Sequence, residues 1–198
     1  FCVLLLNPRG STGRGQAFSD ACIKDLGGGD FQDVLEGLDA ALSKWNFLDG
    51  DRVGITGISY GGYMSNWAVT QTDRFKAAVP ISSISNLISQ WGIGCNHLWF
   101  ESDLQGKPWE NWDLVWDRSP LKHIANCKTP TLLLAGDQDF ITPLEQSEQF
   151  FKALRSLGVP AQLVVYKDEG HGIGYRPKNQ LDSYLRTAAW FKKFLDTP

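Results

Sequence analysis

Gly57-Ile58-Ser59-Tyr60-Gly61 is the stretch of sequence that decides the fold. It has the form G-x-S-x-G, and an apolar run of strand length, residues 52–58, leads into it. A helical pattern over about residues 61–70 follows it. So tight a strand-to-helix turn strains the serine backbone, and the flanking glycines avoid side-chain clashes there. We therefore predict that Ser59 is a nucleophile at the carboxyl edge of a sheet.

The rest of the chain alternates strand-length apolar runs with segments of helical period. Strands are expected at residues 2–6, 77–81, 131–135 and 162–166, in addition to 52–58. Helices are expected after Asp30, which is placed as a cap, after the T-P-L-E capping box at 142–145, and over about 179–194. This order predicts an α/β-hydrolase fold, a mostly parallel sheet with helices on both faces. The tryptophan-rich stretch from Ser82 to about Lys128 is expected to be irregular.

A serine nucleophile needs a base to take its proton. Of the three histidines, His171 lies in the loop after the last expected strand, where the order serine, acid, histidine places the base. We interpret His97 and His123 as structural or surface residues. The acid would come from the loop after the fourth strand, which offers Asp137 and Asp139. We prefer Asp139, because it lies further past the end of the strand, where its side chain could reach His171.

The oxyanion of the reaction also needs hydrogen-bond donors. The backbone N–H of Tyr60, directly after the nucleophile, is placed to be one of them. The helix N-terminus behind it favours negative charge.

Several other functions are excluded by composition and spacing. The formal net charge is −3 without a basic stripe, so nucleic-acid binding is not expected. No apolar run approaches a membrane span. Cys2, Cys22, Cys95 and Cys127 form no C-x-x-C pair, and we expect buried or half-buried thiols and no metal. Gly10, Gly13 and Gly15 do not match the dinucleotide fingerprint, so no cofactor is predicted.

The 198 residues are enough for one domain. Because Phe1 opens directly onto an apolar run without an initiator methionine, we expect a piece of a longer protein. The cysteines do not decide the compartment, and a cytoplasmic location is our expectation.

Eight short sequence motifs occur in order along nearly the whole chain. They are residues 7–13 (NPRGSTG), 27–31 (GGGDF), 57–63 (GISYGGY), 72–77 (TDRFKA), 108–111 (PWEN), 119–121 (SPL), 128–131 (KTPT) and 170–172 (GHG). Together they resemble the catalytic domain of the prolyl oligopeptidase family, especially its acylaminoacyl-peptidase and dipeptidyl-peptidase-like members.

The resemblance implies a serine peptidase with Ser59 as nucleophile, Asp139 as acid, His171 as base and the Tyr60 N–H as oxyanion donor. It implies short peptides or acylated amino termini as substrates, and a β-propeller domain ahead of residues 1–198. The early hydrolase strands and the second oxyanion donor of the family are not in this chain. A homo-oligomer is left open.

For the substrate pocket we predict Ile84, Trp91 and Phe100, against the alternative that they are ordinary core. Two other functions are weighed. A carboxylesterase could use the same triad, since the fold does not fix the substrate. A catalytically silent binding or assembly domain is the other alternative.

Overall fold

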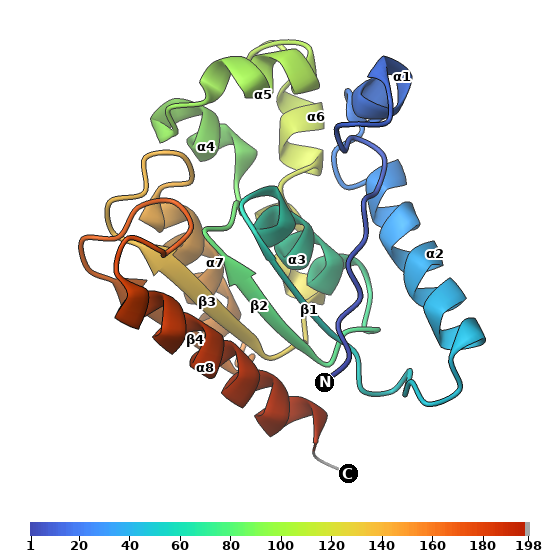
Figure 1. Ribbon diagram of the computed structural model, residues 1–198. Helices are drawn as coiled ribbons and strands as arrows, with labels where there is room; N and C mark the ends of the chain where they lie inside the picture. Colours follow the sequence, from blue (N-terminus) through green and yellow to red (C-terminus); the bar gives the residue numbers. More distant parts are fainter. Residues whose placement is uncertain (197–198) are drawn as a thin grey trace.

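A four-stranded parallel sheet organises the chain, whose computed structural model describes residues 1–196. The strands are β1 (Gly54–Ile58), β2 (Ala77–Ile81), β3 (Thr131–Gly136) and β4 (Ala161–Tyr166), and they lie side by side in this order. All three strand pairs are parallel, and β1 and β2 pair from Gly54 with Ala77 to Ile58 with Ile81. Their carboxyl ends therefore meet at one edge of the sheet (Figure 1). Four of the five predicted strands are confirmed.

Helices cover both faces of the sheet, as predicted (Figure 1). On one face α8 (Pro177–Leu195) packs Trp190 and Leu195 against Val79 and Leu134. On the other face lie α2 (Gly29–Lys44), α3 (Tyr60–Gln71) and α7 (Leu144–Ser156), which share a cluster with Leu133. Neighbouring residues of β3, Leu133 and Leu134, thus enter opposite clusters, because side chains alternate across a strand.

The predicted strand at residues 2–6 is wrong. Residues 1–8 have no regular secondary structure, and among the described residues they pair with no strand. Phe1, Val3 and Leu5 are 74%, 81% and 88% exposed. An apolar run becomes a strand only beside a partner that satisfies its backbone groups, and β1 pairs with β2 alone. Two short helices follow, α1 (Gln16–Ser19) and the 3₁₀ helix η1 (Asp20–Cys22).

The stretch from Ser82 to Lys128, expected to be irregular, is largely helical. It holds α4 (Leu87–Ile93), α5 (His97–Leu104), α6 (Trp112–Asp117) and the 3₁₀ helix η2 (Pro120–Asn126). Each is eight residues or shorter, which leaves too few turns for a helical period to stand out in the sequence. In Figure 1 α4, α5 and α6 lie beyond the carboxyl edge of the sheet, whereas η2 packs against α3 and α7.

Two predicted helix caps are also wrong. Helix α2 begins at Gly29, one residue before Asp30, and its first N–H donates to Asp25 Oδ2 at 2.8 Å. Helix α7 begins at Leu144 after Pro143, and the Thr142 side chain makes no capping bond. In both places the polar side chain is used elsewhere, at the site described below.

Cys22 and Cys127 are buried free thiols, as expected, whereas Cys2 and Cys95 are exposed. No helix in residues 1–196 combines the length and the apolar character that crossing a membrane requires.

Candidate active site

The turn between β1 and α3 holds Ser59 in a strained conformation. Its backbone angles are φ 60° and ψ −116°, in a region that residues with a side chain rarely adopt. The Ser59 N–H donates to the Ile81 carbonyl at 3.0 Å, which fixes the turn to the end of β2. Strain of this kind persists only where the surrounding structure enforces it.

Two glycines give this turn its room. A Cβ on Gly57 would lie 2.6 Å from the Gly61 backbone, and one on Gly62 would lie 2.6 Å from the Ile81 carbonyl oxygen. A Cβ on Gly61 would meet nothing within 4 Å. The prediction that the turn needs glycine is therefore confirmed at Gly57 and wrong at Gly61. A side chain on Gly57 would clash with the Gly61 backbone, whereas a side chain on Gly61 would clash with nothing.

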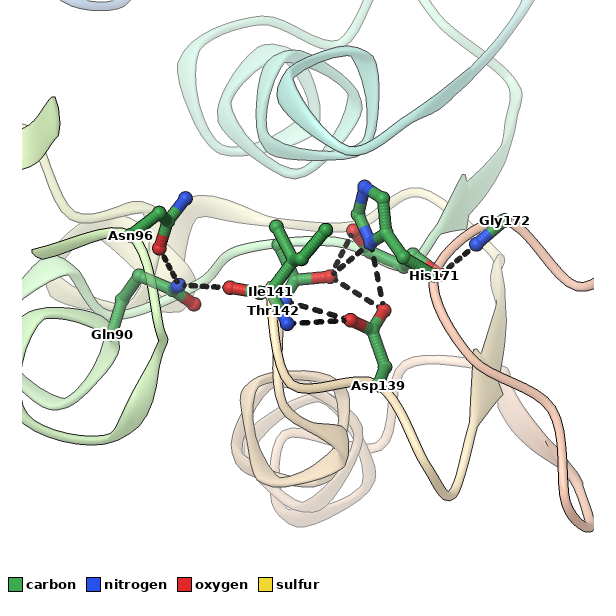
Figure 2. A network of polar contacts seen from close by, with 8 residues as sticks. Gln90, Asn96, Asp139, Ile141, Thr142, His171 and Gly172 are labelled. Carbon is green, nitrogen blue, oxygen red and sulfur yellow. Dashed lines mark hydrogen bonds and ion pairs between the residues drawn. The ribbon is translucent and has the colours of Figure 1, made fainter.

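His171 and Asp139 form a hydrogen-bonded pair in the loops after β4 and β3. His171 Nδ1 lies 2.9 Å from Asp139 Oδ2, and the side chains are 22% and 1% exposed. Figure 2 shows the imidazole with one nitrogen directed at Asp139 and the other pointing away from it. The arrangement leaves Nε2 for a further partner, which a general base requires.

The buried Asp139 carboxylate has a full set of donors. Its Oδ1 accepts the N–H groups of Ile141 and Thr142, both at 2.9 Å, and Oδ2 accepts from the Thr142 hydroxyl at 2.9 Å. Burial acts to raise the pKa of Asp139, but the hydrogen bonds from His171 and Thr142 outweigh it and hold the pKa below its ordinary value. Asp139 is thereby kept ionised beside the histidine.

Asp137, the competing acid, lies elsewhere. Its Oδ1 accepts the Asp168 N–H at 2.7 Å and the Gln138 amide at 3.3 Å, so it joins the loop that follows β3 to the loop that follows β4. Of the two carboxylates, Asp139 is the one that the structure brings to His171.

Ser82, the first residue after β2, connects the loops of the site. Its carbonyl oxygen lies 2.8 Å from the Thr142 hydroxyl, whose one hydrogen is shared between this carbonyl and Asp139 Oδ2, and the Ser82 hydroxyl accepts the Gly172 N–H at 3.4 Å. Its own φ is 43°, in the left-handed region. Because the Ile81 carbonyl also accepts the Ser59 N–H, the end of β2 holds the loops after β1, β3 and β4 together at one edge of the sheet. In residues 1–196 no hydrogen bond joins Ser59 Oγ to His171, and such bonds often tighten only with substrate bound.

Tyr60, the first residue of α3, carries an N–H that no earlier helical turn satisfies. Its side-chain hydroxyl donates to Asp30 Oδ2, and its ring contacts the ring of Trp99 edge-on, with 6.2 Å between centroids. Burial raises the pKa of Asp30, although the Tyr60 hydroxyl and the Phe31 N–H oppose the rise. Sequence reasoning missed this role of Asp30 and assigned it to a cap.

The three predicted pocket residues differ in exposure. Ile84 and Phe100 belong to the core, at 3% and 1% exposed. Trp91 is half-buried, and its Nε1 donates to Glu101 at 3.1 Å. Their contact with a substrate stays a prediction.

The other histidines lie away from the acid–base pair. His97 is exposed, and His123 packs its ring against Trp67 with its Nε2 2.8 Å from the Asp117 carbonyl. In the described part of the chain, no group of three or more His, Cys, Asp and Glu side chains is placed to hold a metal ion.

Comparison with known proteins gives a consistent result. The sequence model of the prolyl oligopeptidase family matches residues 1–197. The uncharacterized peptidase YuxL of Bacillus subtilis is 40% identical over 198 residues, and dipeptidyl-peptidase 5 of Porphyromonas gingivalis is 32% identical over 201. The alignments cover 98% of this chain but only 30% and 29% of those proteins.

Solved structures show the same likeness. Uncomplexed acylaminoacyl peptidase of Pyrococcus horikoshii superposes with a TM-score of 0.91 at 37% identity, over 96% of this chain and 32% of that one. A structure of a Mycobacterium tuberculosis puromycin-hydrolyzing peptidase gives a TM-score of 0.87 at 32% identity, over 97% of this chain and 29% of that one. The chain has the α/β-hydrolase fold, as predicted, and spans about a third of the proteins that it matches.

Proposed function

The chain belongs to the prolyl oligopeptidase family, and from this membership and the geometry of its site we propose that the protein containing it is a serine peptidase. Ser59 is the nucleophile, His171 the base and Asp139 the acid that orients the histidine. The observation that carries the proposal is the buried Asp139–His171 pair at the same sheet edge as the strained Ser59 turn.

The reaction uses Ser59 Oγ and His171 Nε2. With Nδ1 bonded to Asp139, His171 Nε2 takes the proton of the Ser59 hydroxyl as Oγ attacks the substrate carbonyl carbon. Nε2 then gives that proton to the leaving amine, the C–N bond breaks, and an acyl-enzyme remains on Ser59. Water, deprotonated by the same nitrogen, hydrolyses the ester and restores the serine.

The negative oxygen of the tetrahedral intermediates is bound by the Tyr60 N–H. The edge contact with Trp99 and the bond to Asp30 hold the Tyr60 side chain, and so the start of α3, in place. The second donor comes from a part of the protein outside this chain. Losing one oxyanion donor typically costs about 10²–10³ in rate, so residues 1–198 alone should be a much weaker catalyst.

The names of the relatives indicate the substrate class. They include acylaminoacyl peptidases and dipeptidyl peptidases, so we assign short peptides or acylated amino termini as substrates. We propose that residues 1–198 are one catalytic domain, preceded by further hydrolase strands and a β-propeller, as the family resemblance implies. The matched relatives are about three to four times as long as this chain, which leaves room for these parts. The compartment that we propose is the cytoplasm.

The test compares matched substrates on the full-length protein. An amide and an ester with the same acyl group are hydrolysed by wild type and by S59A. The proposal expects amide turnover that S59A abolishes. Ester turnover with negligible amide turnover would instead support a carboxylesterase. If neither substrate is hydrolysed, the result would support a silent binding domain.

A further inference from the structure

The loop that carries Asp139 is held from a second side by the segment of α4 and α5. The Gln90 side chain of α4 donates from Nε2 to the Ile141 carbonyl at 2.6 Å. The Cys95 N–H, between the two helices, donates to the Phe140 carbonyl at 2.8 Å. Two consecutive carbonyls of the acid loop are therefore bound by residues about fifty positions earlier in the chain, and Figure 2 shows the bond between Gln90 and Ile141.

These two carbonyls belong to the peptide groups that bind Asp139. The Ile141 carbonyl and the Thr142 N–H share one planar peptide group, and the Phe140 carbonyl and the Ile141 N–H share the one before it. Both N–H groups donate to Asp139 Oδ1 at 2.9 Å. Gln90 and Cys95 thus hold the far ends of the same two groups whose near ends hold the carboxylate. A hydrogen bond at the carbonyl of an amide also polarises its N–H and strengthens the bond that it donates.

Gln90 is itself firmly placed. Its side chain is fully buried, and the second hydrogen of Nε2 donates to Asn96 Oδ1 at 3.1 Å. Figure 2 shows this chain of bonds running from Asn96 through Gln90 to Ile141, on the side of the loop away from His171. Since both donors of the amide are used, neither end of the bridge turns freely.

We propose that Gln90 is a positioning residue that fixes Asp139, and through it His171, by holding the Ile141–Thr142 peptide. The inference rests on the proposed function, in which Asp139 orients the base. It also assigns a role to the α4–α5 segment. That segment contacts the nucleophile turn through Trp99 and Tyr60, and it holds the acid loop through Gln90 and Cys95.

The experiment is a double-mutant cycle on the full-length protein with a chromogenic peptide amide. Gln90→Met keeps the length of the side chain and removes its donors, and Asp139→Asn removes the carboxylate through which Gln90 acts. We expect Q90M to lower kcat about tenfold with KM within about a factor of two, as for a small misplacement of a catalytic group. In the D139N background, Q90M should change kcat by less than about twofold, because coupled residues are not additive.

The exposed Gln162 of β4 gives the matched control, and Q162M should leave kcat and KM unchanged. If Q90M does not fold, as judged by its melting temperature, Gln90→Asn replaces it, since the shorter amide loses its reach to Ile141. The inference is overturned if Q90M leaves kcat unchanged, or lowers it by the same factor with and without D139N. Failure of the proposed function looks different, because wild type would then not hydrolyse the amide, or D139N alone would leave the hydrolysis at the wild-type level.

Discussion

Asp139 Oδ2 lies 2.9 Å from His171 Nδ1, whereas Asp137, at the start of the same loop, binds the Asp168 N–H. This contact separates two carboxylates that sequence spacing leaves in competition. We predict that D139N lowers kcat by about 10⁴, because the amide no longer holds the histidine in its productive tautomer. Steady-state kinetics of the purified full-length variant measure the loss.

Asp137→Asn is the matched control for this change. It removes the same charge in the same loop without touching His171, and we expect kcat within about threefold of wild type, as for a group outside the reacting unit. Equal losses in D137N and D139N would contradict the assignment of the acid.

The glycines of the nucleophile turn give a second prediction. Gly57→Ala places a methyl group 2.6 Å from the Gly61 backbone, so the turn must open and Ser59 must move. We expect kcat to fall at least about 10²-fold, the loss that a displacement of about 1 Å produces. Gly61→Ala meets nothing within 4 Å, and it should retain folding and most activity. Similar kinetics for G57A and G61A would show that the close approach of Gly57 to the Gly61 backbone does not determine the conformation of the turn.

Tyr60→Phe tests the bond between α2 and α3. The substitution keeps the ring and the backbone N–H but removes the hydroxyl that donates to the buried Asp30 carboxylate. Leaving a buried acceptor without its donor costs about 1–3 kcal/mol, so thermal unfolding should shift to lower temperature. An unchanged melting temperature would mean that Asp30 finds another donor.

The pH dependence of stability follows from Asp30. Burial raises its pKa in the folded state above the unfolded value, so the folded state binds more protons between the two pKa values. Asp30 therefore stabilises the fold most at low pH, and this contribution is lost as the pH rises through the folded-state pKa. Unfolding of wild type and D30N between about pH 4 and 7 measures it. The melting temperature of wild type relative to D30N should fall as the pH rises, and an increase would contradict the shift.

Much of this fold could be predicted because its signals are local. Each of the four confirmed strands is an apolar run bounded by turn residues, and Ser59 sits where strand and helix meet in the sequence as in the structure. His171 and Asp139 were found because the chemistry demands them after later strands, although their contact joins residues 32 positions apart.

What sequence reasoning missed depends on partners that lie far away in the chain. Residues 2–6 have strand composition, but strand structure needs a neighbour, and β1 does not pair with them. Asp30 and Thr142 stand before helical patterns and look like caps, yet their oxygens bind Tyr60 and Asp139. Gln90 gives no signal at all, because an amide in a short helix gains its role only when α4 meets the acid loop.

Mass spectrometry after treatment with a fluorophosphonate probe tests the central claim most directly. The probe reacts only with a serine whose proton a neighbouring base can take, so it reports the assembled Ser59, His171 and Asp139 set. In the full-length protein we predict a single labelled peptide that contains Ser59, with labelling lost in S59A and strongly slowed in D139N. Labelling of another residue, or no labelling of a folded wild-type protein, would contradict the account.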